Sequence, residues 1–205
     1  QLVQTSKRRL KEHIWVPRLV IICDMTSGFA SGMTIRFFPL FFKNKTGLSP
    51  AAVSTIFVIS PLLMVVFARI AYRLSKRLGR VKVPILFNSL GILLLFIMYW
   101  MGEWDDEACW KDWRVIVPIY LLRTAFQNCS RPLRKSLLMD YVPKENRGVV
   151  SSFESVSALG WSGSAALGGQ ILSAYGYGAS FVVTAALQAL ALGVYSSILL
   201  LPGVI

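Results

Sequence analysis

Histidine and acidic residues are scarce in this chain. Its 205 residues include one histidine, His13, and only ten Asp and Glu residues against 22 Lys and Arg residues. A single histidine forms neither a serine–histidine dyad nor a multi-histidine metal centre, so we expect no catalytic residues of that kind, no metal and no other cofactor. The three cysteines, Cys23, Cys109 and Cys129, have no paired spacing, which argues against a disulfide framework and a zinc motif.

Charged residues of either sign are also few. They make up 16% of the chain, whereas 55% is hydrophobic and the mean hydropathy is +0.57. A water-soluble fold of this length does not easily tolerate so much apolar surface. The net charge of +12 is typical of nucleic-acid binding, but no base-stacking or groove-reading motif accompanies it. We therefore predict a membrane protein whose electrostatic partner is membrane lipid, not nucleic acid.

Six apolar stretches are each long enough to cross a bilayer as a helix, which takes about 20 residues. They cover residues 15–42, 48–72, 83–102, 114–141, 148–174 and 178–203. The sequence thus predicts an all-α, polytopic fold with a six-helix transmembrane domain over residues 15–205, preceded by a cytoplasmic linker over residues 1–14.

The links between these stretches differ in charge from one side to the other. Five Lys and Arg residues lie in each of three regions: the amino-terminal tail with the start of the first stretch (to Arg18), the second link, and the boundary between the fourth and fifth stretches (131–147). The first and third links, with Arg114 at the end of the third, hold four in total, set against acidic residues such as Asp106, and the fifth link holds none. Because Lys and Arg resist translocation, both ends of the chain are predicted to be cytoplasmic in a plasma or organellar membrane.

Local signals mark several helix ends and contacts. Ser49 followed by Pro50 is typical of a helix start, Gly79 of a helix end, and Pro143 cannot continue a helix. Small residues recur at close-packing spacing in the first and fifth stretches, which predicts that these helices approach closely. These residues are Gly28, Gly32, Gly160, Ser164 and Gly168.

Two ionisable residues lie deep within the predicted spans. Asp24 in the first stretch and Arg123 in the fourth are each about nine residues from an end, or ~13 Å at 1.5 Å per residue. A charge at that depth is costly unless it faces the bundle interior or a wet cavity. Their opposite signs allow the two residues to pair.

The fourth stretch continues with a polar stripe toward the cytoplasm. Gln127, Ser130 and Arg134 lie on the same helical face as Arg123, with Arg131 at its edge and Asn128 beside it. Glu154 in the fifth stretch lies at the same level. The stripe is either the wall of an aqueous substrate path, with Asp24 and these residues as its binding and coupling groups, or a set of structural ion pairs.

Residues 72–82, in the second link, resemble the cytoplasmic signature loop of the major facilitator superfamily. Arg77, Gly79 and Arg80 match its pattern, whereas Tyr72 and Lys76 replace a Gly and an Asp, and Val81 departs as well. A second segment, residues 139–148, is similar to the family's junction between the fourth and fifth helices of a six-helix half. It has an Asp-x-Val-Pro-x-x-x-Arg-Gly turn followed by a glycine-rich helix.

The resemblance implies half of a major facilitator fold, here the carboxy-terminal half, whose partner is an amino-terminal six-helix half. It implies a secondary active transporter that moves a small solute by alternating access and is driven by coupling to an ion or proton gradient. In this family the first and fourth helices of a half line the substrate path, which is where Asp24 and Arg123 fall. The cytoplasmic gating candidates are Arg77, Gly79, Arg80, Asp140 and Arg147, and we expect Arg77 or Arg80 to lie close to Asp140.

Of two other functions, one remains an alternative and the other is disfavoured. A receptor or scaffold of the same fold, which does not transport, is the alternative. An intramembrane hydrolase needs a serine–histidine or paired-aspartate arrangement within the spans, and the sequence offers neither. We therefore predict that the chain is not an enzyme.

Overall fold

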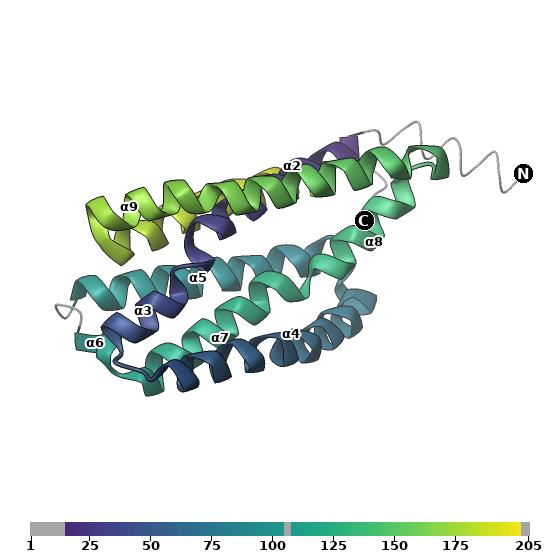
Figure 1. Cartoon of the computed structure of the whole chain (residues 1–205). Coiled ribbons are helices and arrows are strands. Elements are labelled where there is room, and N and C mark those ends of the chain that lie inside the picture. The colour runs from purple at the N-terminus through teal and green to yellow at the C-terminus, as the bar shows by residue number, and fades with distance from the viewer. Residues whose placement is uncertain (1–14, 105–107, 202–205) are drawn as a thin grey trace, which may run out of the picture.

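The chain folds into a bundle of helices in the computed structural model (Figure 1). The structure describes residues 15–104 and 108–201, so the predicted linker, the acidic residues 105–107 and residues 202–205 lie outside the described residues. The elements are α2 (Trp15–Ile35), α3 (Phe38–Lys45), α4 (Pro50–Leu78), α5 (Lys82–Trp104), α6 (Ala108–Lys111), α7 (Trp113–Cys129), α8 (Arg131–Tyr141), η1 (Lys144–Asn146), α9 (Arg147–Ser196) and η2 (Ser197–Leu200). No described residue lies in a strand, which confirms the all-α prediction.

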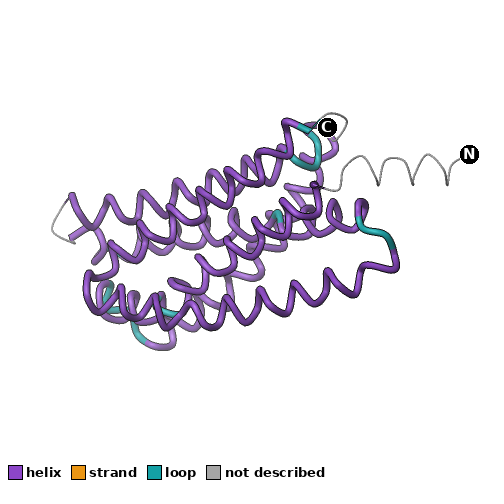
Figure 2. The backbone as a smooth tube through the Cα atoms, turned by 90° about the horizontal axis from the view of Figure 1, so that it is seen from above, coloured by secondary structure: helices purple, strands orange, loops and turns teal. Residues whose placement is uncertain are grey.

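The long helices run side by side and are joined by short links (Figure 2). Helix α2 packs along α9, α5 lies between α9 and α7, and α4 packs on α7. The chain reverses direction within α9 at Gly176, whose φ of 78° suits glycine (Figure 1). The predicted fifth and sixth stretches are therefore the two antiparallel parts of α9.

Two stretches predicted as single helices are each broken in the structure. The stretch over residues 15–42 divides into α2 and α3 at Arg36 and Phe37, and the stretch over 114–141 divides into α7 and α8 at Ser130. A proline lies just beyond each break, Pro39 in α3 and Pro132 in α8. Because a proline ring clashes with the carbonyl four residues before it and lacks an N–H, neither helix continues through its proline.

The ends of α4 agree with the signals in the sequence. The Ser49 side chain accepts a hydrogen bond from the Ala52 backbone N–H at 3.3 Å, and Pro50 is the first helical residue. Gly79 ends the helix with a φ of 95°. The helix runs to Leu78, six residues beyond the predicted end of the second stretch, so most of the basic residues of that link lie on its last turns.

Three helical segments among the described residues are long and apolar enough to cross a membrane. They are Pro50–Leu78, Lys82–Glu103 and Lys144–Leu200, and the third contains the reversal at Gly176. Helix α7, with 17 residues, is shorter than one crossing because of the break at Ser130.

The close contact between α2 and α9 depends on small residues. A side chain on Gly32 would overlap the Trp161 carbonyl oxygen, and one on Gly168 would overlap the Met33 carbonyl oxygen. The predicted close approach is confirmed at these two positions. Gly28 has open space around it, so it is not needed for this contact.

Candidate functional site

The predicted deep aspartate pairs with an arginine, but not with Arg123. Asp24 on α2 accepts a hydrogen bond from Arg134 Nε on α8 at 2.8 Å. The Arg134 side chain is 3% exposed and that of Asp24 39%. Arg134 lies seven residues before the end of α8, a depth of ~10 Å that is close to the ~13 Å of Asp24, so the two residues meet in the half of the bundle that holds the start of α2.

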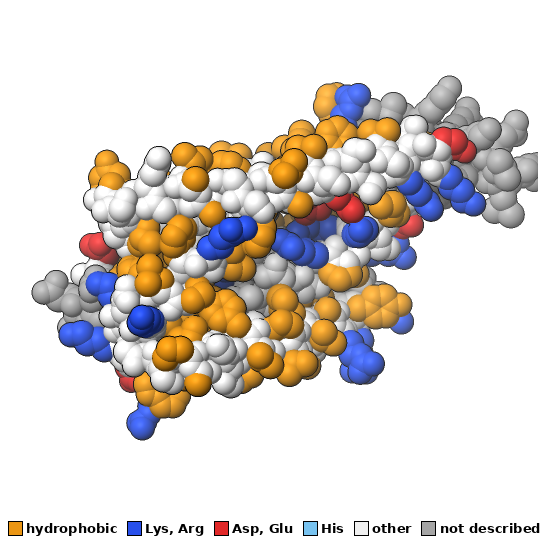
Figure 3. All heavy atoms as spheres, viewed as in Figure 1, with side chains coloured by type: hydrophobic (Ala, Val, Ile, Leu, Met, Phe, Trp, Pro, Cys, Tyr) orange, Lys and Arg blue, Asp and Glu red, His pale blue; other side chains and the backbone are white. Residues whose placement is uncertain are grey.

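A second ion pair lies beside the first. Lys135 on α8 lies 2.9 Å from Glu154 on α9, and both side chains are about half exposed. Asp24, Lys135 and Glu154 line one small cavity of about 40 Å³ between α2, α8 and the first part of α9. Figure 3 shows basic and acidic side chains together beneath α9, toward α8. Lys135 was not predicted from the sequence, because it lies off the polar stripe.

Arg123 is buried without an acidic partner among the described residues. Its side chain is 2% exposed, and its guanidinium carbon lies 5.7 Å from the centre of the Phe38 ring. The buried Nε and Nη2 atoms have no hydrogen-bond partner, and the ion pairs of the described residues use Arg80, Arg134 and Lys135 instead. Two neighbouring atoms on α7, Thr124 Oγ1 and Gln127 Oε1, are also buried and unpartnered.

The burial of Arg123 and Gln127 corrects one expectation. Both avoid the lipid-facing surface, but they are 2% and 5% exposed and are covered by the chain's own atoms. They therefore do not line an open face in this arrangement. Aromatic residues of α3 and α7 cover this region, and the centres of the Phe38 and Tyr120 rings lie 4.5 Å apart. The break before α3 places Phe38 here, which a continuous first helix does not predict.

The remaining stripe residues have different surroundings. Asn128 Nδ2 donates a hydrogen bond to the Thr124 carbonyl of its own helix at 2.8 Å. Arg131 is exposed. Ser130 Oγ is buried, 3.5 Å from the Asn88 side-chain carbonyl on α5, and 3.3 Å from Arg134 Nη1, which donates to it.

Several buried polar residues escaped the sequence prediction. Asn88 is one, and Gln188 on α9 is another, donating from Nε2 to Ser31 Oγ on α2 at 3.0 Å. Thr34 hydrogen bonds with Thr184 on the neighbouring helix. Uncharged polar residues within apolar stretches are a signal that could have identified all of them.

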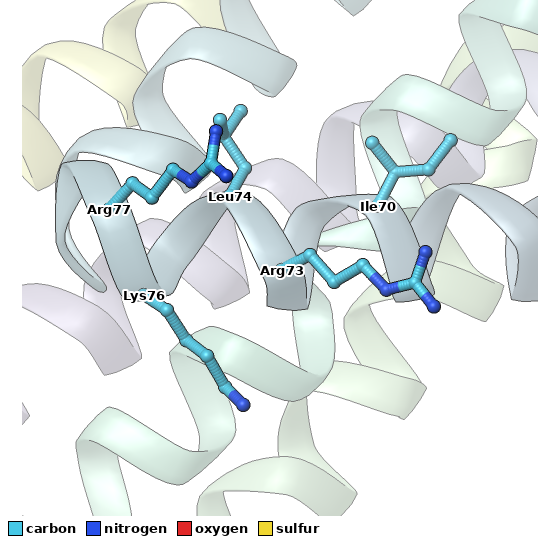
Figure 4. Close-up of a pocket in the computed structure, with 5 residues that line it drawn as sticks. All are labelled: Ile70, Arg73, Leu74, Lys76 and Arg77. Atoms are coloured by element: carbon cyan, nitrogen blue, oxygen red, sulfur yellow. The ribbon is translucent and has the colours of Figure 1, made fainter.

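The cytoplasmic gating candidates divide into two groups. Arg80 Nη1 lies 2.6 Å from Asp140 Oδ2, which confirms the predicted contact, and Arg147 donates to the Met139 carbonyl at 3.4 Å. Arg77 does not join them. With Arg73, Lys76 and two apolar residues it lines a surface pocket of about 540 Å³ at the end of α4 (Figure 4).

A comparison with protein families decides the classification. A model of the Major Facilitator Superfamily matches residues 20–203, nearly the whole chain. The chain belongs to the major facilitator superfamily. Membership makes it an integral membrane protein of a transporter family rather than a family of enzymes. None of the curated proteins compared with it matches.

Proposed function

We propose that the chain is the carboxy-terminal half of a secondary active transporter that moves a small solute by alternating access. Its six transmembrane helices are α2 with α3, α4, α5, α7 with α8, and the two parts of α9, and its partner is an amino-terminal six-helix half. The Asp24–Arg134 ion pair is the observation that carries this proposal, because it joins the first and fourth helices inside an apolar bundle. Ionisable groups inside membrane helices mark substrate or ion pathways.

Coupling to a proton or ion gradient is supported by the two neighbouring carboxylates. Asp24 and Glu154 line the same small cavity and each holds a cation from α8. Protonation of Asp24 removes the charge that compensates buried Arg134, so the contact between α2 and α8 weakens. A residue that couples proton binding to transport must favour one state of the cycle when it is protonated and another when it is not, and a helix contact that depends on protonation does this.

The Arg80–Asp140 contact supports alternating access at the cytoplasmic end. It links the segment after α4 to the end of α8, and both side chains are more than half exposed. Water-exposed ion pairs are worth about 0–1 kcal/mol. Such a weak contact can hold the cytoplasmic end closed in one state of the cycle and still break easily when the protein changes state.

The basic pocket at the end of α4 supports a cytoplasmic orientation for this end of the bundle. Arg73, Lys76 and Arg77 have no acidic partner among the described residues, and Ile70 and Leu74 lie beside them. Cations next to apolar residues at a helix end match the anionic headgroups of a cytoplasmic leaflet. We propose anionic lipid as the partner of this pocket.

Reconstitution tests the transport proposal. The full-length protein in proteoliposomes is given a defined mixture of small organic anions, cations and neutral solutes, and their accumulation is measured by mass spectrometry. Imposed proton and sodium gradients are compared with none. We expect at least one solute to accumulate with a gradient, and we expect Asp24→Asn to uncouple accumulation from it. Absence of accumulation under every gradient contradicts the proposal.

A further inference from the structure

Two arginines are buried within the described part of the bundle. Arg123 and Arg134 lie on the two parts of one broken helix and are almost equally buried, at 2% and 3% exposed. Arg134 has Asp24 at 2.8 Å and Ser130 Oγ at 3.3 Å. Arg123 has neither a carboxylate nor a hydrogen-bond acceptor at Nε and Nη2. The described residues therefore compensate one buried guanidinium and leave the other uncompensated.

No acidic residue of the described chain is available to Arg123. Asp24, Asp140 and Glu154 are each paired with another cation. Asp112 accepts a hydrogen bond from the Arg114 backbone N–H at the start of α7, and neither Glu103 nor Glu145 forms an ion pair with Arg123. Nε and Nη2 are covered by the chain's own atoms, so any partner from outside this chain, a solute included, reaches them only in another arrangement of the bundle.

The Phe38 ring compensates the guanidinium only in part. An aromatic face attracts a cation, and 5.7 Å from the ring centre is within range of that attraction. A ring face accepts no strong hydrogen bond in the plane of the guanidinium, however, so the N–H groups of Nε and Nη2 remain unpaired. An uncompensated charge buried this deeply calls for a partner that the described residues do not supply.

The atoms around Arg123 define what that partner is. Guanidinium presents paired N–H donors whose spacing matches the two oxygens of a carboxylate or phosphate. The Thr124 hydroxyl, unpartnered one residue away, can donate to the same oxyanion. Gln127, one helical turn on, supplies an amide with an unpartnered oxygen, which accepts a hydrogen bond from a neutral hydroxyl or amine of the same molecule.

We propose that Arg123 binds an oxyanion group of the transported solute, so that the substrate is a small organic anion or a zwitterion. Thr124 assists at the oxyanion, and Gln127 contacts a polar group beside it. This inference rests on the proposed transport function. The solute replaces a missing acidic partner, and the site is therefore charge-balanced only when it is loaded.

Thermal unfolding of the full-length protein in detergent, followed by tryptophan fluorescence, gives the first test and needs no ligand. Arg123→Met removes an uncompensated buried charge, so we expect a higher Tm than that of the wild type. Arg134→Met is the matched control, because it leaves Asp24 without a partner and lowers the Tm. If Arg123→Met and Arg123→Gln both have a lower Tm than the wild type, the protein already compensates the charge of Arg123. That result overturns the proposal.

Added anions give the second test. Sodium acetate, succinate and phosphate are each compared with sodium chloride at equal ionic strength in the wild type, in Arg123→Met and in Arg36→Met, an exposed control on the outer side. Some salts stabilise any protein, so the measured quantity is the Tm shift of the wild type minus that of Arg123→Met. We expect a positive difference of several degrees for at least one oxyanion, with Arg36→Met behaving as the wild type. Equal shifts in all three proteins overturn the inference.

Uptake into proteoliposomes separates this inference from the transport proposal. Accumulation of anions or zwitterions by the wild type, lost in Arg123→Met, supports both. Accumulation restricted to cations or neutral solutes overturns the anion site and leaves transport standing. An Arg123-dependent Tm shift without any uptake supports the anion site and counts against transport.

Discussion

Asp24 and Arg134 form an ion pair whose two members differ in exposure. The arginine is almost completely buried, whereas the aspartate retains partial access to water. The free-energy cost of breaking the pair therefore depends on which residue is replaced. An unpaired Arg134 is shielded from water, whereas an unpaired Asp24 is still partly hydrated.

This asymmetry gives a prediction about stability. Asp24→Asn leaves Arg134 uncompensated and is expected to destabilise the protein by about 3–5 kcal/mol, with a smaller loss for Arg134→Met. The double variant removes both charges and is expected to recover most of the loss. Thermal unfolding of the four proteins measures the coupling. Additive effects in the double variant contradict a direct interaction.

The sequence indicated which residues matter at this scale, but not their partners. Depth along a helix marked Asp24 and the polar stripe as costly groups inside the membrane. It also placed Asp24 level with Arg123, whereas the structure pairs it with Arg134. Depth is a single coordinate, and the break at Ser130 changes the direction of the fourth helix, so the choice of partner depends on packing between helices.

Small residues set the distance between α2 and α9 at the scale of the elements. Gly32 and Gly168 each lie against a backbone carbonyl of the other helix, and backbone cannot move aside as a flexible side chain can. The contact between these helices thus depends on the absence of two side chains.

Alanine substitution tests that dependence. Gly168→Ala brings a methyl group onto the Met33 carbonyl and is expected to destabilise the protein by about 1–3 kcal/mol. Gly163→Ala, on the same part of α9, is the matched control because its surroundings are open, and it is expected to leave stability unchanged or slightly raised. Equal effects of the two substitutions contradict the close contact.

The elements themselves were predictable to different degrees. The helix boundaries at Ser49 and Gly79 follow from local chemistry that the sequence shows directly. The breaks before Pro39 and Pro132 were missed, because hydrophobicity was continuous across them and some prolines, such as Pro61 in α4, lie inside unbroken helices. The sequence alone does not show whether a proline breaks a helix or lies inside a continuous one.

The Arg80–Asp140 contact is the proposed cytoplasmic gate of the transport cycle. Exchanging the charges in Arg80→Asp with Asp140→Arg keeps the ion pair, whereas either single change places like charges together. We expect each single variant to lower the transport rate several-fold and the exchanged pair to recover it, measured by uptake into proteoliposomes. Arg77→Ala is the control, since Arg77 lines the neighbouring pocket and does not contact Asp140 in the described structure. A single variant with the rate of the wild type contradicts the gating role.

The distribution of cations predicts the orientation of the whole molecule in its membrane. Lys82 begins α5 near the basic end of α4, and Lys111 ends α6 at the other end of the bundle. Both side chains are exposed, so a cysteine at either position is open to reagents from its own side. In a protein whose native cysteines are replaced by serine, we expect Lys111→Cys to react with a membrane-impermeant maleimide on intact cells. Lys82→Cys is expected to react only after permeabilisation, because the positive-inside rule places the more basic end in the cytoplasm. Labelling in the reverse order contradicts the orientation, and labelling of both positions on intact cells contradicts a single orientation.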